Sequence, residues 1–358
     1  MAGLFGINNS NRHSDEFWTK NCFNSSFPAA LANYMYSQEI SVNYIKVDEN
    51  LRPFVTTLPV RELYNMGQRN SLEQLYFAFE SKYDPYQSFA YETIDGIDLV
   101  IKGTDNVFLR PLEVKLTVIP DSTTCDLEDE SLWGSEIVFR SATTQYCTLG
   151  MTNSLVDHLD SIRDMFERPC SRIQDWGNKT EVRARLPGLL DICNSFEQRF
   201  FDHQQPLIMQ PIWKTQGQDP LLVEHGALDI FVWSDFAFTR LFLTSPLLDI
   251  EANKPLSRQN RAAARFIRYW YEVARNGRVH LRDIYRQMTF DLQTDKEFSV
   301  PGNVTNPYMR CDRLAHLAVD RDALFDIILD RGEEQLMPER RFDQSVLYYT
   351  MRNPRPGN

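Results

Sequence analysis

Alternating apolar and polar positions between residues 93 and 118 predict a β-hairpin. Two runs rich in Val, Ile, Leu and Phe flank Gly103-Thr104-Asp105-Asn106, a sequence typical of a tight turn. If these four residues form the loop, Lys102 pairs with Val107 and the alternation continues along both strands. One face is then apolar and suited to packing on a core. It carries Ile97, Leu99, Ile101, Leu112, Val114, Leu116 and Val118.

The opposite face of this hairpin carries groups that could hold a metal ion. Asp98 lies diagonally from Glu113 in the expected register, within about 7–8 Å at the backbone. Both carboxylates could therefore reach one hard cation such as Mg²⁺. Hydrolysis of a phosphodiester needs neutralised charge and an oriented water, and Lys115 on the same face can orient that water. A lysine beside a metal also has a lowered pKa, which allows partial general-base behaviour.

Two segments of this hairpin resemble the PD-(D/E)xK nuclease motif. Gly96-Ile97-Asp98-Leu99-Val100 corresponds to the first half and Glu113-Val114-Lys115 to the second. The proline is absent, which leaves Asp95 as a rival for the role of Asp98. The run from Lys115 to Asp121, with Thr123-Thr124 and the strand-like Glu136–Arg140, resembles the HindVP-type family of Type II restriction endonucleases.

The resemblance, which covers residues from about 90 to 150, implies a fold and a ligand set. We expect an α/β protein with a PD-(D/E)xK nuclease-like mixed central sheet flanked by helices, and with additional, mostly helical recognition elements. Mg²⁺ would be held by Asp98, Glu113 and the backbone carbonyl of Val114. Many members add an acid from a helix before the hairpin. Ser71 and Gln74 form a capping box that predicts a helix to about Lys82, so Glu80 or Glu73 is a candidate.

Length and composition are those of a folded protein. The 358 residues, 42% of them hydrophobic, can build a sizeable core. We expect a catalytic core over residues 1–155 and a mostly helical DNA-recognition and dimerisation region over 156–358, packed on the core. No apolar stretch is long enough to span a membrane and no secretion signal is evident, so we expect a cytoplasmic protein.

Several classes of site are disfavoured by missing motifs. The six cysteines include no CxxC pair, which disfavours a zinc knuckle or a disulfide framework and favours free buried thiols. The sequence also lacks GxxxxGK[ST] and contains no Gly-Lys pair. We therefore expect no nucleotide cofactor and no ATP-driven motor.

A local excess of arginine is the candidate DNA-binding feature. The net charge of −11 argues against indiscriminate nucleic-acid binding, but Leu256–Gln287 holds eight arginines and two acids. Ser257 could cap a helix that ends at Asn276-Gly277. One face could track a DNA backbone, although Glu272 would pair with Arg268 or Arg275, and a solvated helix of ion pairs is the alternative. The candidate contacts are Arg258, Arg261, Arg265, Arg268, Arg275 and Arg278.

Elsewhere the pattern predicts elements in less detail. Ala29–Tyr36 and residues 154–167 and 186–202 look helical, and Ile40–Val47 looks like a strand. A strand pair within residues 221–243 is expected to act as scaffold, and residues 293–310 are expected to form a long loop.

Together these features predict a Mg²⁺-dependent Type II restriction endonuclease that acts on double-stranded DNA. It would cut both strands of a palindromic site to leave 5′-phosphate ends, and a homodimer would match the symmetry of that site. The family resemblance also implies a cognate DNA methyltransferase. Two alternatives remain open: a structure-specific repair or junction-resolving nuclease on the same core, and a non-catalytic DNA-binding or interaction scaffold.

Overall fold

The structure is a computed structural model that contains a large sheet and a group of helices. None of the described helices is both long and apolar enough to cross a lipid bilayer. The described residues are 29, 31–47, 53–116, 136–200, 207–210, 213–216, 219–222, 229–232, 256, 258–290 and 296–301.

A seven-stranded sheet runs through the molecule in the order β2-β1-β7-β10-β5-β4-β3. Every pairing in it is antiparallel, whereas the sequence predicted a mixed sheet. Neighbours β1 and β2, and β3, β4 and β5, follow one another along the chain, which favours antiparallel pairing over the crossovers that parallel strands need. The strands are β1 (Val42–Val47), β2 (Pro53–Leu58), β3 (Leu75–Ser81), β4 (Ile97–Gly103), β5 (Phe108–Leu116), β7 (Leu207–Gln210) and β10 (Asp229–Val232).

The sheet draws on both halves of the sequence. Strands β7 and β10 lie between β1 and β5, so β10 pairs directly with the strand that carries Glu113 and Lys115. Strand β10 lies within the segment expected to form a strand pair, and residues 223–228 and 233–243 of that segment lie outside the described residues. Two small sheets also occur among the described residues: β6 (Glu136–Arg140) with β11 (Lys296–Pro301), and β8 (Trp213–Gln216) with β9 (Asp219–Leu222).

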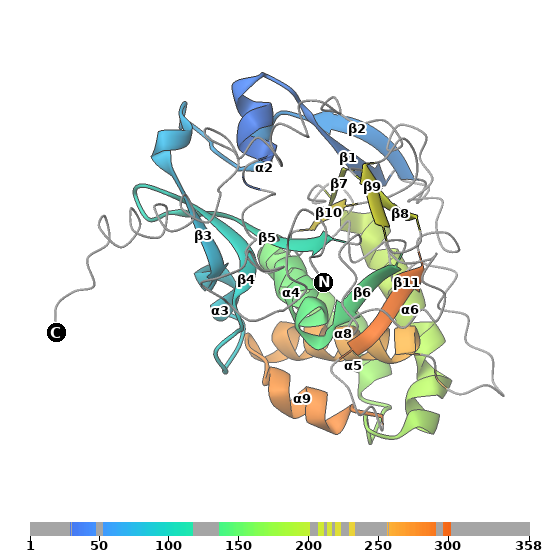
Figure 1. The fold of residues 1–358 in the computed structure, drawn as a ribbon. Helices are drawn as coiled ribbons and strands as arrows, with labels where there is room; N and C mark the ends of the chain where they lie inside the picture. Colours follow the sequence, from blue (N-terminus) through green and yellow to red (C-terminus); the bar gives the residue numbers. More distant parts are fainter. Residues whose placement is uncertain are drawn as a thin grey trace, which may run out of the picture.

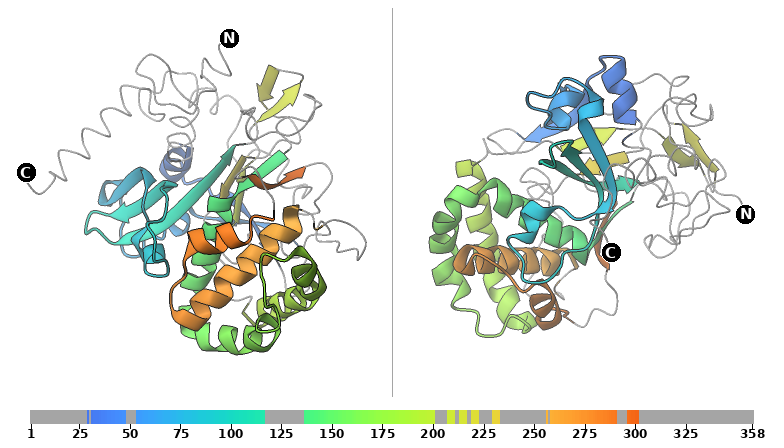
Figure 2. Two further views of the ribbon diagram at one scale, coloured as in Figure 1. Left: turned by 90° about the horizontal axis from the view of Figure 1, so that it is seen from below. Right: turned by 90° about the vertical axis from the view of Figure 1, so that its left-hand side faces the viewer.

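The larger helices gather on one side of the sheet, with β1, β2 and α2 at the opposite end of the molecule (Figure 1). Helix α8 lies among α4, α5, α6 and α9 (Figure 2). The helices are α2 (Val60–Leu63), α3 (Asp84–Gln87), α4 (Ser141–Ser154), α5 (Leu159–Cys170), α6 (Lys179–Phe200), α8 (Arg258–Asn276) and α9 (Leu281–Gln287). Single 3₁₀ turns span Leu72–Gln74 and Val156–His158.

Helix α8 is the centre of the hydrophobic core. Ala262, Ala263 and Ala264 favour a helix and allow close packing, and all three are fully buried. Trp270 makes edge contacts with Phe166 of α5 and Phe196 of α6. The helix ends where it was predicted to end, because Gly277 adopts a left-handed φ of 74°.

Helix α4 joins this core to the sheet. Its residues 146–152 are all buried, and Ile97 and Val100 of β4 belong to the same hydrophobic cluster. Buried hydroxyls on α4 are satisfied within the helix: Thr148 donates to Thr144 O (2.9 Å) and Thr152 to Thr148 O (2.8 Å). Val100 belongs to this cluster whereas Leu99 and Ile101 on either side of it do not, so the face of β4 that carries Asp98 and Val100 is the face covered by the helices.

The structure confirms several predicted elements and corrects others. The helix at 29–36, the strand at 40–47 and the strand at 136–140 are present, and Cys147, Cys170 and Cys193 are buried free thiols. The predicted loop at 293–310 is wrong for residues 296–301, which form β11 and pair with β6. The predicted helix from Ser71 to Lys82 is also wrong.

The segment after Ser71 forms one 3₁₀ turn and then strand β3. The predicted capping box is present, with Glu73 N–H donating to Ser71 Oγ (3.2 Å) and Ser71 N–H donating to Gln74 Oε1 (3.3 Å). Pairing with β4 then extends the chain from Leu75 onward. The pattern of Leu72, Leu75, Tyr76 and Phe79 fits a helix, but tertiary pairing overrides it.

Candidate functional site

The predicted hairpin is present as β4 and β5, but its register differs from the expected one. Leu99 pairs with Leu112 where the sequence predicted Arg110, a shift of two residues. The loop closes through Gly103, whose N–H donates to Val107 O (2.8 Å), and Asn106 adopts a left-handed φ of 64°. A shift of two preserves which residues share a face, so Asp98 and Glu113 stay on one face as predicted, although that face also carries the fully buried Val100.

The observed register brings three acids into one row across β3, β4 and β5. Because Leu99 pairs with Leu112, the next residues along, Asp98 and Glu113, lie opposite each other. Because Phe79 pairs with Leu99 and Ser81 with Ile97, Glu80 lies opposite Asp98 on its other side. Glu80 therefore lies near Asp98, as predicted, but on a strand and not on a helix. Its φ of 46° is unusual for a residue other than glycine.

The solvent exposure of the three acids increases across the row from β5 to β3. Glu113 is only 8% exposed, Asp98 is half-buried and Glu80 is exposed. Burying several carboxylates close together is unfavourable unless positive charge offsets their repulsion. The row supplies carboxylate oxygens, which are the donor atoms that a hard divalent cation prefers.

Tyr146 of α4 lies within the electrostatic range of these three acids and of Asp95. Burial raises its pKa most, and the nearby charges of Glu113, Asp95, Asp98 and Glu80 raise it further. One phenol thus lies within the field of four carboxylates. Asp95, the rival for Asp98 in the sequence analysis, is therefore a neighbour of Asp98 at the same site.

Gly96 fixes the distance between β3 and the residues that carry these acids. Tyr146 donates a hydrogen bond from its hydroxyl to Gly96 O (2.8 Å). A methyl group at Gly96 would lie 2.6 Å from Glu80 O, closer than real contacts allow. Gly96 is thus held between Tyr146 and the backbone of Glu80, with Asp95 beside it and Asp98 two residues on.

Lys115 and Val114 lie on β5 directly after Glu113, as the motif requires. Their backbones pair with Ile230 and Phe231 of β10, which holds this end of β5 inside the sheet. Alternation places Lys115 on the face of Glu113. The side chains of both residues lie outside the described part of the structure, so the roles assigned to them stay predictions.

The arginine-rich segment forms helix α8 as predicted, but its arginines do not share one exposed face. Arg265 is fully buried, donates to Met288 O (2.6 Å) and lies over the rings of Tyr285 and Phe290. The predicted DNA contact by Arg265 is therefore wrong. The arginines do recur at helical spacing, but the segment around α9 covers α8 at Arg265.

The remaining arginines of this set differ in their surroundings. Arg268 pairs with Glu272 (2.5 Å) and lies over Trp176, so one of the two expected partners is found. Its pKa is lowered, first by burial. Arg261 is half-buried, whereas Arg275 and Arg278 are exposed, and Arg278 donates to Ser88 O (3.0 Å). The side chain of Arg258 lies outside the described residues.

A pocket beside Asp95 was not anticipated. It has a volume of about 200 Å³ and is lined from three directions: the loop before β4, the start of α4, and α9. Asp95 and Gln145 line it on the side of the acids, and Arg282 and Arg286 line it from α9. No sequence motif marks it, because its wall is formed by segments nearly 200 residues apart.

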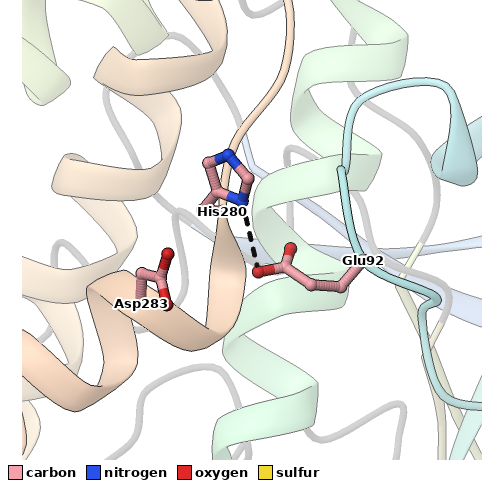
Figure 3. Close-up of side chains that lie close together, drawn as sticks. All are labelled: Glu92, His280 and Asp283. Atoms are coloured by element: carbon pink, nitrogen blue, oxygen red, sulfur yellow. Dashed lines mark ion pairs between the residues drawn. The ribbon is translucent and has the colours of Figure 1, made fainter.

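Glu92, His280 and Asp283 form a cluster next to this pocket, where His280 and Glu92 face each other (Figure 3). Their ligand atoms lie within 4.8 Å of one another. Glu92 pairs with His280 (3.6 Å) and accepts a hydrogen bond from Leu281 N–H (3.1 Å). These contacts join the loop before β4 to the start of α9, which gives the cluster a structural role.

Comparisons with known proteins identify the family to which the chain belongs. A family model described as HindVP restriction endonuclease matches residues 18–351. The Type II restriction enzyme HgiDI of Herpetosiphon aurantiacus is 36% identical over 352 residues, 97% of this chain and 96% of that protein. The probable Type II restriction enzyme HindVP of Haemophilus influenzae is 32% identical over 347 residues, 96% of this chain and 92% of that protein. No solved structure is significantly similar.

Proposed function

Because the chain belongs to the HindVP restriction endonuclease family and is thereby a Type II restriction enzyme, we propose that it cuts both strands of one palindromic DNA site with Mg²⁺. The observation that carries this proposal is the row of Glu80, Asp98 and Glu113 across the neighbouring strands β3, β4 and β5. The proposed catalytic core is of the PD-(D/E)xK type, with its motif on β4 and β5.

Asp98 and Glu113 are the proposed primary ligands of the cation, because they lie opposite each other and Glu113 is buried. The backbone carbonyl of Val114 is the proposed third ligand, and Glu80 or Asp95 could supply a further oxygen. When bound, Mg²⁺ would offset the negative charge of the phosphodiester and of the leaving oxygen. An all-oxygen donor set fits this ion.

Lys115 is the residue proposed to orient the attacking water. Its ammonium group would donate to the attacking water and face the negative charge of the scissile phosphate. Attack forms a bond from the water oxygen to phosphorus and releases a proton of that water to solvent, while the bond between phosphorus and O3′ breaks and the departing O3′ takes up a proton. One fragment then carries a 5′-phosphate and the other a 3′-hydroxyl.

In this proposal Tyr146 takes no part in the reaction and only positions neighbouring residues. Its hydrogen bond to Gly96 O holds the backbone between Asp95 and Asp98. Burial and the surrounding carboxylates raise the pKa of Tyr146, so the phenol keeps its proton and remains a donor. The four acids are thereby held in one arrangement before a cation or DNA arrives.

A palindromic DNA site has two-fold symmetry, and a homodimer has the same symmetry. Cutting both strands of a palindrome is simplest for a homodimer, in which each subunit supplies one acid row. A cognate methyltransferase that protects the same site would accompany such an enzyme.

Digestion of long linear DNA of known sequence tests this proposal. We expect discrete fragments in the presence of Mg²⁺, with sequenced ends that share one palindromic site and carry 5′-phosphates. A continuous smear, or cutting only at branched or damaged DNA, would contradict the proposal and favour a structure-specific nuclease.

A further inference from the structure

The pocket beside Asp95 combines the acid row with positive charge from another element. Arg282 and Arg286 lie one turn apart on α9 and line the pocket together. Across from them are Asp95 and Gln145, and Gln145 directly precedes Tyr146 on α4. The pocket thus includes Asp95, three residues before Asp98, and the residue that precedes Tyr146.

The two arginines are available for an anion. Within the described residues Arg282 is exposed and forms no ion pair or hydrogen bond. Arg286 pairs only loosely with Asp283 (3.8 Å), and their side chains are 75% and 68% exposed. An exposed pair of this kind contributes little and is easily exchanged for a better partner. Guanidinium groups bind phosphate through paired, parallel hydrogen bonds.

The rest of the lining suits a phosphate and disfavours a second cation. Glu92 faces the pocket but is already engaged by His280 and by Leu281 N–H. Ser141 and Gln145 add hydrogen-bond donors from α4. A volume of about 200 Å³ is several times that of a water molecule, about 30 Å³, so a phosphate group fits.

We infer that this pocket binds a backbone phosphate of the substrate DNA next to the scissile one, held by Arg282 and Arg286. The inference rests on the proposed nuclease function and names residues for it. Binding there places the neighbouring phosphodiester over the acid row, because Asp95 belongs to both sites. The backbone contact thus comes from α9 and not from the buried arginine of α8.

The salt dependence of DNA binding tests this inference without any cleavage. Each phosphate contact steepens the plot of log K against log salt by about 0.9. In metal-free buffer we expect Arg282→Ala and Arg286→Ala each to flatten the slope by about 1 and to weaken binding to all duplexes alike. Arg282→Lys should keep the slope. Arg172→Ala, an exposed arginine outside the pocket, is the matched control and should match the wild type.

A neutral methylphosphonate linkage beside the cleaved bond locates the contact. In the wild type it should weaken binding, and in the Arg282→Ala/Arg286→Ala double variant it should add no further loss, as a double-mutant cycle requires for direct partners. Wild-type slopes in both alanine variants, or fully additive losses at every linkage near the cut, would overturn the inference. Failure of the proposed function would appear separately, as wild-type protein that does not cut DNA with Mg²⁺.

Discussion

Replacing Tyr146 by phenylalanine removes one hydroxyl group from the centre of the proposed site. The side chain is 3% exposed, so the ring can stay in place while Gly96 O loses its donor at 2.8 Å. A lost hydrogen bond costs about 0.5–1.5 kcal/mol, and an unsatisfied buried carbonyl raises this to about 1–3 kcal/mol. We expect the free energy of unfolding to fall by an amount in that range.

The same change should weaken the response to Mg²⁺. If about 1.4 kcal/mol of the lost stabilisation comes from the arrangement of Asp95 and Asp98, the Mg²⁺ concentration for half-maximal cleavage rises about tenfold. DNA binding in metal-free buffer should not change. The assay is the initial rate of plasmid cleavage against Mg²⁺, together with urea denaturation of the same preparations.

Tyr271→Phe is the matched control for this prediction. Tyr271 is 2% exposed, and its hydroxyl donates to Glu167 (2.6 Å) within the helical layer. It should lose comparable stability and keep the wild-type response to Mg²⁺. A Tyr146→Phe enzyme that loses stability but responds to Mg²⁺ as Tyr271→Phe does would refute the positioning role.

Three further changes separate structural roles from functional ones. Gly96→Ala should cost about 1–3 kcal/mol of stability by overpacking, because the new methyl group meets Glu80 O; unchanged urea denaturation would contradict the close approach. Arg265→Ala should cost about 1–3 kcal/mol, because it leaves the buried Met288 O without this donor, while the salt slope of DNA binding stays as in the wild type; a flattened slope would restore a DNA contact. The hydrogen bond from Arg69 lowers the pKa of Asp105, so its stabilisation is present above the ordinary value of 3.8 and lost as pH falls through the folded value. Asp105→Asn should therefore lower the denaturation midpoint at pH 7, and the difference should shrink in acid; a constant difference would argue against the ion pair.

The hairpin could be predicted because its information is local. Alternation and turn residues specified two strands and the face that carries Asp98 and Glu113. The register was wrong by two residues, because it depends on how the loop closes, with Asn106 in a left-handed conformation. That detail changes a diagonal relation between the two acids into an opposite one.

Contacts between distant segments could not be predicted in the same way. Glu80 was assigned to a helix, since its neighbours fit helical spacing, and only pairing with β4 makes the segment a strand. Arg265 looked exposed by periodicity, but the packing of other helices around α8 buries it. Tyr146 and the arginines of α9 join the site only through the folded arrangement, so no local pattern reveals them.

The central claim is that Asp98 belongs to a metal-dependent cutting site. Its most direct test is the rate of DNA cleavage at saturating DNA and Mg²⁺ by Asp98→Asn, compared with Asp157→Asn, which changes an exposed acid in the helical layer. We predict that Asp98→Asn loses at least about a hundredfold in rate while it binds DNA and unfolds as the control does. Cleavage by Asp98→Asn at the rate of the control would contradict the account.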